Sequence, residues 1–350
     1  MRDLTTYKNV IKNEPAGLVQ EKPQQYAEIF YAQVDKYIDQ LKSYEWKCLQ
    51  PGADPENLLK EISSLNDTMV QDCALFEQEV SDPAAIKTAQ SYFRKKTNPV
   101  LSTSYGVNRI RTWPQGHQGD YMTLELIYKN MPMSYGLGYY LDKYMLDVEL
   151  GVGVRERIVK LRDLLKDELA SRRNPKVLDI ACGSCREVFE LTPEIISSGA
   201  KFSCVDLDPA ALDFAIDRLT YAGLTSEHAE MLAYNALRIF DFETALAEFG
   251  MRDIIYSVGF FDYLPDEFLI KLLRSLYMLL NPGGKIIAAF KDVKYYRPQL
   301  YHWFADWDGF LQRTVVDFNR LFHEANIPDS ALTMTRVKSG SIVFYTVTKQ

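Results

Sequence analysis

The sequence predicts an α/β protein, in which a helical N-terminal unit precedes a mostly parallel sheet whose strands alternate with helices. Three observations support this prediction. In the first 150 or so residues, apolar side chains recur at helical steps without strand-like alternation. From about residue 176 onward, short apolar or β-branched runs alternate with helical patterns, as in βαβ units. The last two runs are separated only by Lys338, Ser339 and Gly340, which predicts a hairpin with one antiparallel strand.

The helical unit is expected at residues 1–150, and the sheet domain at residues 151–350. A second amphipathic run covers 56–80, between Pro51-Gly52 and Asp82-Pro83. Between 97 and 132 the chain is rich in Gly, Pro, Asn and aromatic residues, which predicts an irregular connecting loop. The first helix is predicted from one apolar face, made by Tyr26, Ile29, Phe30, Val34 and Ile38.

Seven strands are predicted in the sheet domain. The first five are expected to run parallel with helices between them, and the final pair forms the hairpin. They are placed at 177–181, 202–205, 226–231, 254–258, 285–290, 332–337 and 342–348.

Composition indicates which partners to expect. The 350-residue chain is 47% hydrophobic and can bury a full core. Its formal net charge of −7 argues against nucleic acid as a partner and favours a small-molecule substrate. No stretch reaches the roughly 18 apolar residues of a membrane helix, so no membrane insertion is expected. The N-terminus, with Arg2, Asp3, Lys8 and Lys12, shows no apolar signal region. The oligomeric state does not follow from these patterns.

The five cysteines are odd in number and scattered, which does not indicate a disulfide framework. Free thiols and a cytoplasmic location are therefore expected. Cys182 and Cys185 have the spacing of a redox or metal-binding pair. We interpret them instead as small residues of a tight turn, and we expect no metal. The four histidines have no metal-ligand spacing.

The strongest motif is the run 177–186, in which an apolar strand enters a turn of small residues and then a helix. Small residues at the carboxyl end of such a strand let the backbone approach a ligand closely. Asp206 ends the next strand, where a carboxylate can accept both ribose hydroxyls of a nucleoside. Only Gly183 is present instead of three glycines, which leaves little provision for a pyrophosphate. The motif therefore favours S-adenosyl-L-methionine (SAM) over NAD as the cofactor.

These residues and their order resemble the class I SAM-dependent methyltransferases from residue 176 to the end of the chain. The resemblance implies a Rossmann-like sheet, with the helical domain as a lid over the substrate. Ala181 stands where that family has its first glycine. The loop 253–265 resembles the segment that borders the sulfonium, and 280–285 resembles the turn into the fifth strand. The implied cofactor-binding residues are Asp179, Ala181, Gly183, Asp206, Leu207, Asn235, Ala236, Ser257, Val258 and Gly259.

The flanks resemble a bacterial family that methylates 3-hydroxy fatty acids into ester signals. The resemblance rests on the blocks 113–121, 124–128 and 304–307, and on Arg313-Thr314. Gln115, His117 and Gln118 depart from the family pattern. This resemblance implies a shared scaffold more than a shared substrate.

The tyrosine-rich stretch 135–144 and the block 116–128 are expected to close over the methionine end of SAM. Tyr139 and Tyr140 would face the sulfonium cation, because an aromatic face attracts a desolvated cation. Asp120 and Tyr128 are expected among the cofactor contacts. The alternative is that these tyrosines only pack the helices, and that Asp179 only holds the turn.

The expected reaction is O-methylation of a small-molecule carboxylate or hydroxyl. A carboxylate is ionised near neutral pH and needs no general base, whereas a hydroxyl would need one, and His117 or His302 is the candidate. Two alternatives stay open. The first is a SAM-using enzyme that does not methylate, through aminocarboxypropyl transfer or cyclisation with release of methylthioadenosine. The second is a non-catalytic SAM-binding regulator.

Overall fold

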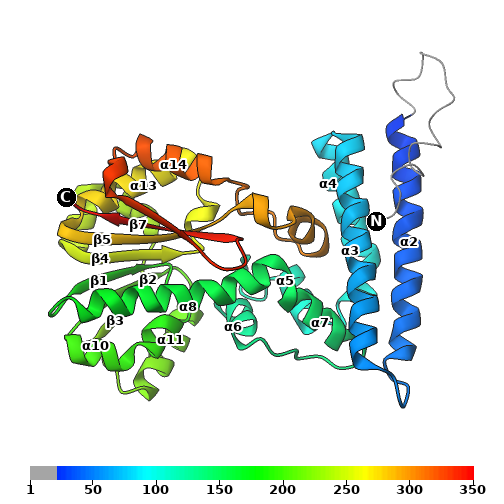
Figure 1. Cartoon of the computed structure of the whole chain (residues 1–350), viewed down its shortest axis with the longest axis horizontal. Coiled ribbons are helices and arrows are strands. Elements are labelled where there is room, and N and C mark those ends of the chain that lie inside the picture. Colours follow the sequence, from blue (N-terminus) through cyan, green and yellow to red (C-terminus); the bar gives the residue numbers. More distant parts are fainter. Residues whose placement is uncertain (1–21) are drawn as a thin grey trace. The chain divides into compact units, whose positions relative to one another are not determined.

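A computed structural model describes residues 22–350, which form two compact units: a helical unit that ends at Val100, and a larger unit, Leu101–Gln350 (Figure 1). The N-terminal segment in which no signal region was expected lies outside the described residues. None of the helices described is both long and apolar enough to cross a membrane.

The helical unit contains α2 (Lys22–Lys47), α3 (Pro55–Val80) and most of α4 (Pro83–Leu101). The first two helices pack through aromatic side chains, with the Phe30 and Phe76 ring centroids 4.8 Å apart. The Tyr37 hydroxyl donates a hydrogen bond of 2.6 Å to the Asn66 Oδ1 atom between the same helices. The two amphipathic runs predicted as helices are thus confirmed.

The irregular loop predicted at 97–132 is wrong in most of its length. The segment contains α5 (Tyr105–Thr112) and α6 (Tyr121–Lys129). Side chains that cap the first turn explain why these helices form despite their glycines and aromatic residues. Ser104 accepts a hydrogen bond from the Val107 amide, and Asp120 accepts one from the Thr123 amide.

The division between the units falls at Val100, earlier than the boundary expected near residue 150. Helices α5, α6, α7 (Leu137–Asp147) and α8 (Glu149–Ala170) all belong to the larger unit. Leu146 and Leu161 lie in the same buried cluster as strand residues such as Val177. Helical periodicity predicts that these segments are helices, but it does not indicate which neighbour buries their apolar faces.

The sheet has seven strands in the order β3-β2-β1-β4-β5-β7-β6 (Figure 1). The first five pair in parallel, and β7 runs antiparallel to both β5 and β6. This is a Rossmann-like arrangement with a terminal antiparallel hairpin, which confirms the fold class. The strands are β1 (Lys176–Ile180), β2 (Lys201–Asp206), β3 (Ala229–Ala233), β4 (Arg252–Val258), β5 (Leu280–Lys291), β6 (Leu332–Arg336) and β7 (Ile342–Thr348).

Helices cover both faces of the sheet (Figure 1). Successive residues of β1 point to opposite faces, so Val177 packs in one buried cluster and Leu178 in the other. The first face is covered by α8, α9 (Arg186–Glu190), α10 (Thr192–Ser198) and α11 (Pro209–Tyr221). The second face is covered by α12 (Phe242–Phe249), α13 (Asp266–Met278) and α14 (Val315–Glu324).

Candidate cofactor and substrate cavity

The turn after β1 has an unusual backbone. Ala181, Gly183 and Cys185 all have positive φ angles, of 58°, 54° and 47°. A side chain at Gly183 would meet only the Tyr121 Cβ atom, at 3.9 Å, and would otherwise point into open space. Only small residues fit a turn of this kind at the edge of a cavity.

Asp206, at the end of β2, is held by the backbone on both of its oxygens. Its Oδ2 atom accepts a hydrogen bond of 2.8 Å from the Gly183 amide, and its Oδ1 atom accepts one of 2.9 Å from the Asp208 amide. A carboxylate oxygen has more than one acceptor site, so both remain able to accept a further bond. The carboxylate is therefore fixed between the ends of β1 and β2, where ligands of such sheets bind.

A cavity of about 740 Å³ opens at these strand ends. One side, which we name the strand-end wall, is formed by the loops that follow β1 to β5. It includes Ala181, Gly183, Asp206, Leu207, Asn235, Ala236, Val258, Gly259 and Lys291. The other side, which we name the helical wall, comes from 110–157 and 301–310. It includes Ile110, His117, Met145, Val148, Leu150, Val154, Arg157, Tyr301, Trp307 and Phe310.

The cavity brings together nine of the sixteen residues that the sequence suggested. Ala181, Gly183, Asp206, Leu207, Asn235, Ala236, Val258, Gly259 and His117 line it. Seven residues do not line it, namely Asp179, Ser257, Asp120, Tyr128, Tyr139, Tyr140 and the candidate base His302.

Ser257 and Asp120 are occupied by structural hydrogen bonds. The buried Ser257 hydroxyl donates to the Ile180 carbonyl at 2.8 Å, across β4 and β1. Asp120 caps α6 and accepts a bond of 2.5 Å from the Arg109 guanidinium. Both side chains therefore stabilise the structure around the site and do not line the cavity.

The three tyrosines also lie away from the cavity lining. The Tyr139 side chain is 40% exposed, and its ring meets that of Tyr140 edge to face at a centroid distance of 5.2 Å. The Tyr128 hydroxyl accepts a hydrogen bond of 3.2 Å from Arg157, which does line the cavity. The aromatic residues found in the cavity are different ones, among them Tyr121, Tyr234, Tyr263 and Trp307.

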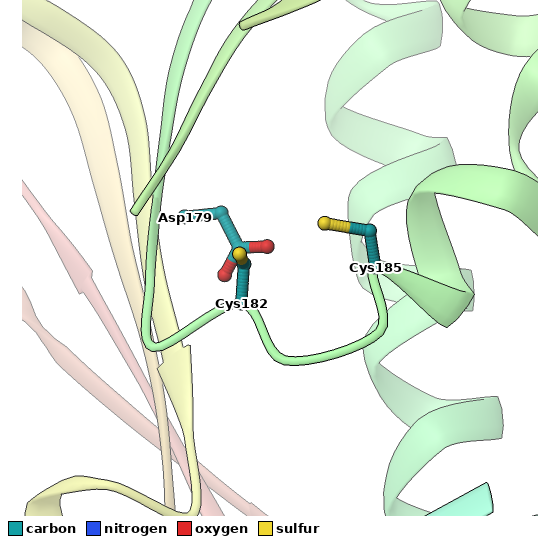
Figure 2. A group of neighbouring side chains, drawn as sticks. All are labelled: Asp179, Cys182 and Cys185. Carbon is teal, nitrogen blue, oxygen red and sulfur yellow. The ribbon is translucent and has the colours of Figure 1, made fainter. Parts of the chain in front are cut away.

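Asp179 lies in the protein interior beside Cys182 and Cys185. Figure 2 shows the three side chains on the inner side of the turn, and their ligand atoms lie within 4.8 Å of one another. Burial and the nearby Glu187 carboxyl raise the pKa of Asp179, and burial raises the pKa of Glu187 to about 7. Hydrogen bonds from Cys182 and Cys204 lower the pKa of Cys185 to about 5. That the turn holds no metal or redox pair stays a prediction.

Glu125 joins the two walls. This buried carboxylate on α6 accepts hydrogen bonds from Ser184 at 2.8 Å, from Arg218 at 2.7 Å and from Arg186 at 3.1 Å. Burial by itself raises the pKa of Glu125, but the bonds from Arg218 and Ser184 lower it overall. The network fixes the cofactor turn against α6, which contributes Tyr121, Leu124 and Ile127 to the helical wall.

One ion pair and one close histidine–carboxylate contact at the cavity were not predicted. Lys291, at the end of β5, is buried against Asp262 with an Nζ–Oδ2 distance of 2.6 Å. The His117 Nε2 atom lies 3.5 Å from Asp208 Oδ2, which supplies the acid partner that the sequence did not reveal. No sequence signal identifies these pairs, because their members are far apart in the chain.

Comparison with known proteins agrees with the fold. Residues 178–286 match the sequence family described as a methyltransferase domain. No curated protein matches the chain.

The chain is similar to many solved structures, among them the three that follow. A possible exported protein from Bordetella parapertussis is 17% identical, with a TM-score of 0.54, over 91% of this chain and 96% of that one. Magnesium protoporphyrin IX methyltransferase from Synechocystis PCC 6803, with bound SAM, is 11% identical, with a TM-score of 0.42, over 58% and 82%. The N-methyltransferase NodS from Bradyrhizobium japonicum WM9 is 16% identical, with a TM-score of 0.37, over 56% and 95%. At 17% identity the likeness to the Bordetella protein concerns the fold alone.

The fold, the cavity and the methyltransferase-domain match define a class of protein: the chain is a SAM-dependent transferase, and SAM is its cofactor. The residues present fit that cofactor. Asp206 is oriented for ribose hydroxyls, the open space at Gly183 admits a ligand against the backbone, and the apolar Leu207 lies at the rim.

Proposed function

We propose that the protein is a methyltransferase that acts on a carboxylate or hydroxyl of a small, largely apolar molecule. One observation carries this proposal. The cavity has a strand-end wall of small residues with the Asp206 carboxylate among them, which suits a nucleoside, and it continues into a helical wall rich in apolar and aromatic side chains. An apolar acceptor placed there would lie beside the cofactor.

The proposed cofactor contacts are the residues of the strand-end wall. Asp206 would accept hydrogen bonds from the ribose hydroxyls, and Leu207 and Ala236 would pack against the adenine, with Asn235 near its amine. Val258 and Gly259 would border the methionine end. Asp179, Ser257, Asp120 and Tyr128 would act indirectly, by holding the turn and the helices in place.

The lid expected at residues 1–150 is proposed for 101–150, because this segment supplies side chains of the helical wall. Met145 and Val148 come from the end of α7 and the residue that follows it, and His117 comes from the loop before α6. Tyr139 and Tyr140 would then stabilise the lid by packing, which is the alternative that the sequence left open.

Methyl transfer from SAM requires mainly that the protein position the acceptor and exclude water. Bound SAM supplies an electrophilic methyl group on a sulfonium. The apolar side chains of the helical wall would exclude water and align the acceptor with that methyl group. A carboxylate acceptor needs no base, whereas a hydroxyl acceptor would lose its proton to His117, whose Nε2 atom lies 3.5 Å from Asp208 Oδ2.

The proposed acceptor carries an acyl chain. The block 113–128 resembles that of enzymes that esterify 3-hydroxy fatty acids, and Gly119 and Tyr121 of this block line the cavity. The apolar helical wall is suited to an acyl chain. Five free cysteines among the described residues support a reducing, cytoplasmic compartment.

The test is product analysis with purified protein, SAM and a panel of apolar carboxylic acids and alcohols. Methyl transfer releases S-adenosylhomocysteine (SAH), and the proposal expects SAH together with a methyl ester or ether. Methylthioadenosine in its place would establish a different transfer from SAM. Tight SAM binding without turnover of any acceptor would favour the regulator.

A further inference from the structure

Arg157 is a buried cation of the helical wall. It lies on α8, its side chain is 3% exposed, and it lines the cavity. Its Nη2 atom donates a hydrogen bond of 3.2 Å to the Tyr128 hydroxyl, whereas its Nε atom is buried without a hydrogen-bond partner. An arginine carries five donors and is always charged, so most of its hydrogen-bonding capacity is unused here.

Other buried cations of the described chain differ from Arg157. Arg109, Lys291 and Arg313 each face a carboxylate, at distances of 2.5 to 2.6 Å. Arg252, which also has an unpartnered Nε atom, does not line the cavity. Within residues 22–350, no carboxylate oxygen lies within 4.0 Å of the Arg157 guanidinium. A buried charge without a counter-ion is costly, which indicates that a bound ligand completes the site.

The guanidinium lies at the end of β4, next to the proposed path of the cofactor. A Cβ atom at Gly259 would come within 2.8 Å of Arg157 Nη1, so the glycine leaves room for the planar group. Lys291 also lines this cavity, but Asp262 already balances its charge. A planar guanidinium matches a carboxylate through two parallel hydrogen bonds, and its surroundings here are mostly apolar.

We propose that Arg157 is the anchor of a carboxylate-binding subsite in the cavity, filled by a carboxylate that a ligand carries in. This inference rests on the proposed function, because it assumes that SAM and its acceptor share this cavity. Two ligands can bring the group: the methionine moiety of SAM, or an acceptor with an apolar body and a carboxylate head.

The experiment compares the wild-type protein with Arg157→Met, which keeps the apolar stem and removes the charge. Titration calorimetry measures SAH, which has the methionine carboxylate, and methylthioadenosine, which lacks it. A second titration adds decanoate or decan-1-ol to the SAH-loaded protein. Arg155→Met is the matched control, because Arg155 lies on the same helix, bonds to the Leu146 carbonyl and does not line the cavity.

If the carboxylate comes from SAM, Arg157→Met weakens SAH binding at least tenfold and leaves methylthioadenosine binding unchanged. If it comes from the acceptor, SAH binding is unchanged, and the wild-type preference for decanoate over decan-1-ol, of at least tenfold, is lost in the variant. Arg155→Met changes neither. Arg157→Lys keeps the charge without the paired donors and should fall between wild type and Arg157→Met, which preserves the test if the methionine variant fails to fold.

Wild-type SAH affinity, methylthioadenosine affinity and decanoate preference in a folded Arg157→Met protein would overturn the subsite. A wild-type protein that binds SAH but shows no decanoate preference, together with unchanged SAH binding in the variant, would also overturn it. Failure of the wild-type protein to bind SAH at all would instead overturn the proposed function.

Discussion

The strand-end wall and the helical wall of the cavity are built in different ways. In the strand-end wall, the important features belong to the backbone: positive φ angles at Ala181 and Gly183, and amides that fix Asp206. In the helical wall they belong to side chains such as Met145, Trp307 and Arg157, which come from separate segments of the chain.

This difference suggests a division of labour. Backbone geometry at the strand ends suits a constant ligand, the nucleoside of the cofactor. A surface made of exchangeable side chains suits a variable ligand, the acceptor. Substitutions in the strand-end wall should therefore change SAM binding, and substitutions in the helical wall should change acceptor binding. The predictions below test this separation, from the largest expected effect to the smallest.

Gly183→Val should reduce SAM binding by at least about 100-fold. The new side chain would project into the cavity, and a branched residue at a positive φ angle is strained by roughly 1–2 kcal/mol. Gly223→Val is the control, because it carries a similar strain at φ 88° with nothing within 4 Å and lies outside the cavity. Titration calorimetry measures the SAM affinity of both variants. Unaltered affinity in a folded Gly183→Val protein would show that the cofactor binds at another turn.

Glu125→Gln should lower the free energy of unfolding by about 3 kcal/mol, because it leaves the charges of Arg186 and Arg218 without their buried partner. Chemical denaturation measures the change. Glu190→Gln, at a more exposed ion pair, should cost less than about 1 kcal/mol. Equal losses in the two variants would show that Glu125 does not join the walls in the way described.

Glu187 should make stability depend on pH. Burial raises its pKa to about 7, above the ordinary 4.5, so the folded state holds the proton more tightly than the unfolded state. This contribution is complete below about pH 4.5 and is lost as the pH rises through 7. Denaturation between pH 4.5 and 8 should show that Glu187→Gln removes roughly 1–3 kcal/mol of this dependence. The same slope in both proteins would exclude a raised pKa.

Trp307→Leu should weaken acceptor binding and leave cofactor binding unchanged. Trp307 lines the helical wall, and its indole donates a hydrogen bond of 2.7 Å to the Tyr263 hydroxyl. Loss of its contact area should raise the acceptor KM by roughly tenfold, about 1.4 kcal/mol, at unchanged SAH affinity. A parallel loss of SAH affinity would argue against separate walls.

The sequence contained most of the fold and one wall of the site. The strands and the positions of Gly183 and Asp206 were predictable, because apolar runs and strand-end turns are local features. The surroundings of the Tyr139 and Tyr140 side chains could not be predicted, because helical spacing does not indicate which neighbouring element a helix face packs against. Arg157 is one of several arginines on α8, and only the packed structure shows that no carboxylate of residues 22–350 pairs with its guanidinium. The helices in 97–132 depend on the capping side chains of Ser104 and Asp120, whereas the Gly, Pro, Asn and aromatic composition of the segment favours a loop.

The central claim is that Asp206 holds the ribose of SAM at the strand ends, and titration of SAH into Asp206→Ala tests it most directly. Losing a charge-assisted hydrogen bond and stranding its partners should weaken binding by roughly 1–3 kcal/mol, about 5- to 150-fold. Circular dichroism must show that the variant is folded, because Asp206 also holds the turn through the Gly183 amide. SAH affinity equal to that of the wild type in the folded Asp206→Ala protein would contradict the account.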